Sequence, residues 1–384
     1  MQNYKSLSIV IIVVASILAG CSGASDKESL RYALPEKASL DFVEQFRVSD
    51  PVKDISFRFI RKIHVLSDGN IVVQNDGDHR LYEFTNDGEL VSVIGSYGRG
   101  PGEFLNIWNS VVSVGDTLHI MGNDDSHKVF AKTTDGSWEF IRERTINYVP
   151  MEGLQRHFPD EMVLSDSEGN LYGIYHGFDE SIGGQYRYVS SISYNLEQTG
   201  EVSRPFKTGD VAVLRSEENY YSVDNFRFFN AYYSYLPDTD EVIYVRNNSN
   251  EIKSIDASNN ETIIGFLPFE QVPLNMNEVN GLLNYFRNQV PGSVSYLREK
   301  FLEYEPYYWR ILLNDGRLFV HFERSEKDKP DWVITTLDGE ILGSFHIPMY
   351  IQQLAVNGNR LFVATTGEDG TVYLAGYDLI SSNH

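Results

Sequence analysis

The segment Asp68-Gly69-Asn70-Ile71-Val72-Val73 places a turn sequence directly before an apolar strand. Asp, Gly and Asn are the residues of tight hairpin turns, and Ile and Val are favoured in strands. The same arrangement occurs five more times, at residues 115–120, 168–173, 240–245, 315–320 and 358–363. A turn-strand unit that recurs in this way predicts a repeat architecture.

A second turn follows each of the first five units, at residues 86–88, 134–136, 198–200, 259–260 and 337–339. Two turns per repeat and the incoming strand give about four antiparallel strands, and repeated four-stranded sheets are typical of a β-propeller. The sixth repeat stops near its second turn, whereas a strand-like segment, residues 40–48, stands alone before the first. Because an open ring would expose an unpaired sheet edge, we predict that this segment completes the last blade. The expected fold is an all-β, six-bladed propeller over residues 39–384.

Residues 274–305 interrupt the repeats with helical spacing. Val279, Leu283 and Phe286 share one stripe, Leu297 and Phe301 another, and Pro291-Gly292 separates them. This pattern predicts a helical hairpin inserted in the fifth blade. It would be either a cap packed on the end of the ring or a lid over its central opening.

The glycine-rich segment at residues 95–104 reads Gly-Ser-Tyr-Gly-Arg-Gly-Pro-Gly-Glu-Phe. It resembles the Pro-Gly-Glu-Phe connector of NHL-type propellers, and the chain from about Ser39 onward is similar to the six-bladed β-propeller lipoproteins of Bacteroidetes. The resemblance implies the propeller fold and brings no catalytic motif. A dinucleotide-binding loop would open a helix, whereas strand-like segments flank these glycines and Pro101 interrupts them. We therefore expect a tight crossing between blades, with Phe104 packed between the sheets.

The amino terminus has the pattern of a secretion signal. Lys5 precedes an apolar stretch, residues 9–15, and small residues lead to Cys21 in the order Leu18-Ala19-Gly20-Cys21. This ending resembles the lipobox pattern, which implies removal of residues 1–20 and lipidation of Cys21. A transmembrane anchor is the alternative, but residues 7–20 fall short of the roughly 20 apolar residues that a span needs. Polar residues 21–38 would then form a flexible tether.

The lipidation site also restricts chemistry and location. Cys21 is the only cysteine, which excludes disulfides, a cysteine nucleophile and cysteine-based metal sites. Ser22 is not the aspartate that retains lipoproteins at the inner membrane of enteric bacteria, so we expect an outer-membrane lipoprotein. Whether it faces the periplasm or the cell surface stays open. The formal net charge of -22 opposes binding to nucleic acid.

Candidate catalytic and metal-binding motifs are sparse. The sequence contains no GxSxG elbow or HExxH pattern, so no catalytic residue is predicted. Two polar clusters, residues 75–79 and 123–127, carry oxygen ligands of the kind that Ca²⁺ prefers, but both lack the distal Glu of a calcium loop. We interpret them as solvated turns and expect no cofactor, with Ca²⁺ as the alternative.

Aromatic clusters give the best indication of a binding site. The candidate ligand-binding residues are Tyr232, Tyr233, Tyr235, Tyr307, Tyr308 and Trp309. Core packing is the alternative role, because consecutive strand residues point to opposite faces. The favoured hypothesis is a non-enzymatic, membrane-tethered propeller that binds a protein partner, or a glycan or peptide ligand, at one end of its ring. The alternative is a metal-dependent enzyme of the lactonase or lyase type, which needs several ligands from different blades converging on the axis.

Overall fold

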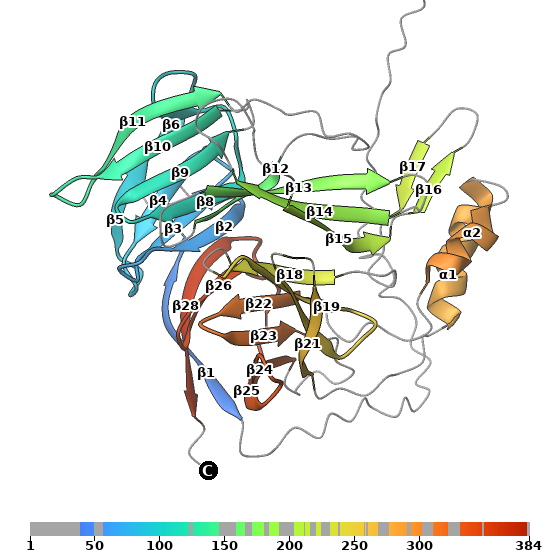
Figure 1. Ribbon diagram of the computed structural model, residues 1–384. Helices are drawn as coiled ribbons and strands as arrows, with labels where there is room; N and C mark the ends of the chain where they lie inside the picture. Colours follow the sequence, from blue (N-terminus) through green and yellow to red (C-terminus); the bar gives the residue numbers. More distant parts are fainter. Residues whose placement is uncertain are drawn as a thin grey trace, which may run out of the picture.

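The computed structural model describes most of the propeller and not the amino-terminal segment (Figure 1). The described residues are 39–49, 57–122, 126–145, 159–165, 171–179, 184–191, 203–210, 212–215, 220–223, 231–236, 239–256, 258, 260–267, 276–289, 293–301, 310–321, 331–347 and 349–381. Cys21 and the predicted signal and tether lie outside them. Among these residues, no helix is long and apolar enough to cross a membrane.

Within this part of the chain the strands form six four-stranded antiparallel sheets, which we number as blades one to six. Blade one contains β2 (Ile60–Val65), β3 (Ile71–Asn75), β4 (Arg80–Phe84) and β5 (Leu90–Ile94). Blade two contains β8 (Ile107–Val114), β9 (Thr117–Gly122), β10 (Ser126–Lys132) and β11 (Trp138–Thr145). Blade three contains β12 (Pro159–Ser165), β13 (Leu171–Asp179), β14 (Gly184–Ser191) and β15 (Ser203–Asp210).

The other three blades follow the same plan. Blade four contains β18 (Ala231–Leu236), β19 (Glu241–Arg246), β20 (Glu251–Ile255) and β21 (Glu261–Phe266). Blade five contains β22 (Arg310–Asn314), β23 (Arg317–His321), β24 (Trp332–Thr336) and β25 (Ile341–Phe345). Blade six contains β26 (Ile351–Asn357), β27 (Arg360–Thr366), β28 (Val372–Ser381) and β1 (Leu40–Val48). Two short pairs, β6 (Ser96–Tyr97) with β7 (Glu103–Phe104) and β16 (Ala212–Arg215) with β17 (Tyr220–Val223), lie outside the blades.

Each predicted turn-strand unit becomes the second strand of a blade. The units at residues 68–73 and 358–363, for example, lead into β3 and β27. Gly69 adopts a φ of 87° in its turn, a left-handed conformation that glycine reaches without steric strain. The turn residues in the sequence therefore locate the second strand of each blade.

The amino-terminal strand closes the ring as predicted. β1 pairs with β28 from Leu40 opposite Ser381 to Val48 opposite Leu374. The ring of Phe46 lies against two glycines, because a Cβ atom would come within 2.4 Å of it at Gly88 and within 2.2 Å at Gly376. The strand thus covers an edge that blade six would otherwise expose.

The hydrophobic core lies between neighbouring blades. Phe319 and Trp332 of blade five pack with Leu361 of blade six in one such layer. The layer between blades one and two contains Phe104, which is 1% exposed. Phe104 ends the glycine-rich connector, and β6 and β7 pair in parallel within that connector. The predicted crossing between blades is confirmed.

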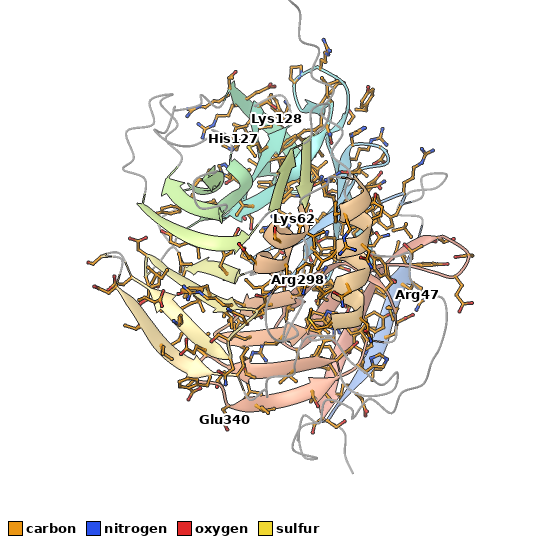
Figure 2. The ribbon with its side chains drawn as sticks, turned by 90° about the vertical axis from the view of Figure 1, so that its right-hand side faces the viewer. Arg47, Lys62, His127, Lys128, Arg298 and Glu340 are labelled. Carbon is orange, nitrogen blue, oxygen red and sulfur yellow. The ribbon has the colours of Figure 1, made fainter. Side chains whose placement is uncertain are left out.

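The helical insertion lies in the connection that leads into blade five. It consists of α1 (Met276–Gln289) and α2 (Ser293–Lys300), and Val279, Leu283 and Leu297 are each 1% exposed. β13 and β23 run toward the helices in Figure 1, so their antiparallel partners, the first strands of the blades, begin at that end. Figure 2 looks onto this end, which we call the capped end, and shows both helices in front of the middle of the ring.

Candidate functional site

The candidate site lies at the capped end, where the first strands of three consecutive blades begin. Arg310 is the first residue of β22 in blade five, Tyr232 is the second residue of β18 in blade four, and Tyr350 immediately precedes β26 in blade six. β22 contacts both β18 and β26, so these three strand starts are neighbours around the axis. Residues far apart in the sequence thereby meet at one end of the ring.

Arg310 is mostly buried, and none of the described residues serves as its counterion. Within the described part of the chain, no hydrogen bond or ion pair reaches its guanidinium group. Burial lowers the pKa of Arg310, and the nearby phenols of Tyr350 and Tyr232 act in the opposite direction. Other arginines do have partners, such as Arg360, which donates to both oxygens of Asp378 at 2.6 and 3.0 Å.

A row of stacked rings holds the neighbourhood of Arg310 in place. His321 of β23 lies directly opposite Arg310 in the strand pairing. Its imidazole stacks on the indole of Trp332 with centroids 4.6 Å apart and planes 9° apart. Trp332 stacks on Phe345 at 5.9 Å. Phe42 of the closing strand continues the row, at 6.2 Å from Phe345. We call this row the ring ladder. It extends from His321, the residue opposite Arg310, into blade six.

Asp331 joins two histidines at the same edge of blade five. Its carboxylate is 3.1 Å from Nδ1 of His346 and 3.9 Å from Nε2 of His321, and it accepts the Ile347 N–H at 3.2 Å. Asp331 is only 6% exposed. A buried carboxylate is stabilised by hydrogen bonds, and Asp331 makes them with His346 and the Ile347 N–H, whereas His321 lies beyond hydrogen-bond distance.

A comparison with protein families identifies the fold independently. The model of the DUF5128 family, described as a 6-bladed beta-propeller, matches residues 52–261. The chain belongs to this family. The six-bladed propeller part of the predicted resemblance is confirmed for this DUF5128 protein, whereas its NHL and lipoprotein parts stay predictions.

The chain is also similar to solved structures at low sequence identity. A member of the DUF4221 family from Bacteroides vulgatus is 9% identical, with a TM-score of 0.51 over 90% of this chain and 99% of that one. A candidate exported protein from Bacteroides fragilis is 14% identical, with a TM-score of 0.49 over 89% of this chain and 95% of that one. Virginiamycin B lyase from Staphylococcus aureus is 10% identical, with a TM-score of 0.42 over 89% of this chain and 100% of that one. No curated protein matches the chain. At these identities the likeness shows the fold alone.

The predicted tyrosines are divided between different environments. Tyr232 and Tyr233 are partly buried and line a small pocket between blades four and five, together with Ile311 and Leu313. Tyr235 is 3% exposed, and its hydroxyl donates to Asp240 at 2.7 Å, so it is part of the packing in this structure. Tyr307, Tyr308 and Trp309 lie outside the described residues, although Trp309 directly precedes Arg310.

The residues with the most distinctive environments were not found from the sequence. Arg310, His321, Asp331 and His346 lie at strand ends, and no local motif connects them. The one available signal was the aromatic run that ends at Trp309, immediately before Arg310. Strand register and the packing of neighbouring blades bring the four side chains to one edge.

The described residues offer no preformed metal centre. No group of three or more His, Cys, Asp or Glu side chains among them could hold a metal ion. In the polar cluster at residues 75–79, Asn75 donates to Asp78 at 2.9 Å, and Asp78 also accepts from Tyr82. Asp76 accepts from Arg61. The carboxylates of this turn are therefore engaged by side chains. Residues 123–125 of the second cluster lie outside the described part.

Proposed function

We propose that this propeller is a non-enzymatic binding module that holds a glycan ligand at its capped end and is displayed from the outer membrane by a lipid on Cys21. The observation that carries the proposal is Tyr350, which is 75% exposed and is the most exposed large apolar or aromatic side chain in the described part of the chain. It immediately precedes β26, which contacts the strand that begins with Arg310, and its phenol acts on the charge of Arg310.

This combination fits a sugar better than an extended peptide. A tyrosine provides a flat apolar face for the C–H groups of a sugar ring and a hydroxyl for its polar edge. Binding sites combine such aromatic surfaces with a few polar groups that set orientation, and Arg310 supplies the polar group here. A peptide ligand or a protein partner is the competing outcome of the test.

A glycan array probed with the mature, full-length protein tests the proposal. We expect binding to at least one class of oligosaccharide, and Tyr350→Ala should weaken it tenfold or more. Tyr97→Ala is the matched control, because Tyr97 is 63% exposed but belongs to the connector after blade one. Capture of peptides without any glycan binding would contradict the proposal, as would equal effects of the two substitutions.

Lipid attachment is tested separately from ligand binding. The support for it is the sequence Leu18-Ala19-Gly20-Cys21 after an apolar stretch. Cys21→Ser removes the thiol to which the lipid would be attached, and at least two acyl chains are needed for stable anchoring. The variant should therefore move from the membrane fraction to the soluble fraction. Retention of the variant in the outer-membrane fraction would contradict the anchor. Protease treatment of intact cells then distinguishes the surface from the periplasmic face.

A further inference from the structure

We infer that Arg310 forms a carboxylate-binding subsite, so that the ligand of the capped end is an acidic saccharide. This inference rests on the proposed glycan-binding function and names the chemical class of its ligand. The juxtaposition that carries it is a mostly buried guanidinium group, between the strand starts of blades four and six, with no counterion among the described residues.

The chain contains many carboxylates that could have served as a counterion for Arg310. The sequence contains 54 Asp and Glu residues and only 32 Lys and Arg residues, so carboxylates are plentiful. On the opposite end of blade six, Arg360 is held by both Asp378 and Asp87. A buried charge without a partner is costly, and a carboxylate from a ligand would supply the two parallel hydrogen bonds that a guanidinium group favours.

The surroundings of Arg310 limit how it can move to find another partner. His321 lies directly across the strand pair, and such opposite residues have Cβ atoms about 4.5–5.5 Å apart. The imidazole of His321 is fixed between the indole of Trp332 and the carboxylate of Asp331. The residue opposite Arg310 is therefore held by ring stacking, which favours a preorganised ligand site.

A further basic side chain lies on the helical cap. Figure 2 shows Lys62 of β2 and Arg298 of α2 near the middle of the ring when the capped end faces the viewer. Arg298 is exposed, and it lies on a helix of the cap rather than on a blade. The exposed Arg298 adds a positive charge to this end of a protein whose net charge is -22, which favours anions there.

A carboxylate suits this site better than a phosphate. One guanidinium group matches the two oxygens of a single carboxylate. A phosphate monoester carries a charge of about -1.5 to -2 at pH 7, and the strongly acidic protein opposes that charge more. The exposed ring of Tyr350, which directly precedes the neighbouring strand β26, supplies the face on which the sugar carrying the carboxylate would stack.

The test uses tetragalacturonate and its methyl ester as matched probes, because the ester keeps the sugar rings and removes the charges. Calorimetric titration of the full-length protein should show that the free acid binds at least tenfold more tightly than the ester. Arg310→Gln should abolish that preference, so that the variant binds the free acid no more tightly than the ester. The control is Arg317→Gln, because Arg317 lies at the other end of blade five and donates to Asn359 and Gly358.

The possible failures separate the two proposals. If the wild type binds the acid and the ester equally, and Arg310→Gln has the same affinities, the carboxylate subsite is overturned. The proposed glycan site is retained in that case. Binding of neither probe, together with a blank glycan array, would overturn both. If neither acetate nor phosphate at the same ionic strength displaces tetragalacturonate from the wild type, and Arg310→Gln still binds the acid more tightly than the ester, Arg310 is not the subsite. Circular dichroism and the Tm of Arg310→Gln verify that it folds, and we expect its Tm to equal or exceed that of the wild type.

Discussion

The imidazole ring of His321 lies flat on the indole ring of Trp332, with centroids 4.6 Å apart and planes 9° apart. The two residues are opposite one another on β23 and β24, so sheet register alone brings them into contact. From Trp332 the ring ladder continues through Phe345 and Phe42 to Tyr377, whose ring is 3.9 Å from that of Phe42. The closing strand and the candidate site are thus two ends of one packed row.

Two tryptophans should respond differently to the same substitution. The Nε1 atom of Trp332 is buried and has no hydrogen-bond partner among the residues that the structure describes, whereas that of Trp138 donates to Glu83 at 2.7 Å. Trp332→Phe removes an unsatisfied donor and should lower the free energy of unfolding by less than about 1 kcal/mol. Trp138→Phe removes a bond to a charged group and should lower it by about 1.5–3 kcal/mol. Urea unfolding measures both, and a larger loss for Trp332→Phe would contradict the assignment.

Glu83 should be a strong stabilising contact between blades one and two. Its side chain is fully buried and accepts hydrogen bonds from Asn70, Ser92, Trp138 and Lys132, the last at 2.8 Å. Glu83→Ala leaves these donors without their acceptor and should cost about 3–5 kcal/mol in chemical denaturation.

Glu44 provides the matched control for Glu83. Like Glu83, it accepts hydrogen bonds from several side chains, here Arg47 and Tyr377, but its own side chain is 37% exposed. Solvent screens an exposed pair, so Glu44→Ala should cost less than about 1 kcal/mol. Similar losses for the two variants would show that burial of Glu83 is not what makes its network strong.

Acid should destabilise the fold through a buried histidine pair. Nδ1 of His119 and Nε2 of His127 are 3.1 Å apart. Burial, aided by Arg142, lowers the pKa of His119 to about 4, and burial, aided by His119 and by Arg142 and Arg144, lowers that of His127 to about 3. Unfolded histidine titrates near 6.5, so the unfolded chain binds more protons below that pH. The stabilisation is complete above about pH 6.5 and is lost as the pH falls toward 4 and 3.

The comparison of urea unfolding at pH 7 and pH 5 measures this effect. Each histidine should account for about 2 kcal/mol of the loss of stability between these two values, because one pKa unit corresponds to about 1.4 kcal/mol. His127→Gln should reduce the difference in the free energy of unfolding between pH 7 and pH 5 by about that amount. An unchanged pH dependence in the variant would show that the pair does not stay neutral in the folded protein.

A disulfide across the ring closure should form spontaneously in the folded protein. Asp41 of β1 lies opposite Ile380 of β28, and opposite residues in antiparallel strands fall within the Cα separation that a disulfide needs. In a Cys21→Ser background, Asp41→Cys with Ile380→Cys should cross-link under mild oxidation and raise the Tm. Asp41→Cys with Asn359→Cys, which are not register partners, should stay reduced. Cross-linking of the control pair would contradict the register of β1.

Much of the blade architecture could be predicted from local sequence. Turn residues such as Gly69 act through backbone conformation, which depends on immediate neighbours, and the strand that follows each turn alternates its side chains automatically. The isolated strand at residues 40–48 could be assigned to blade six because an unpaired edge is unfavourable. The predicted tyrosines were not all brought together, since Tyr232 lies at the candidate site whereas Tyr235 is 3% exposed and packed in its blade.

By itself, therefore, the sequence determined the number of blades, the closing strand and the helical insertion, because short-range turn geometry and hydrophobic periodicity encode them. Only the tertiary structure decided that Arg310 lies opposite His321, that Asp331 joins two histidines, and that no counterion among the described residues meets the guanidinium group. Those relationships depend on register between strands and on packing between blades, so they are long-range properties that no local motif records.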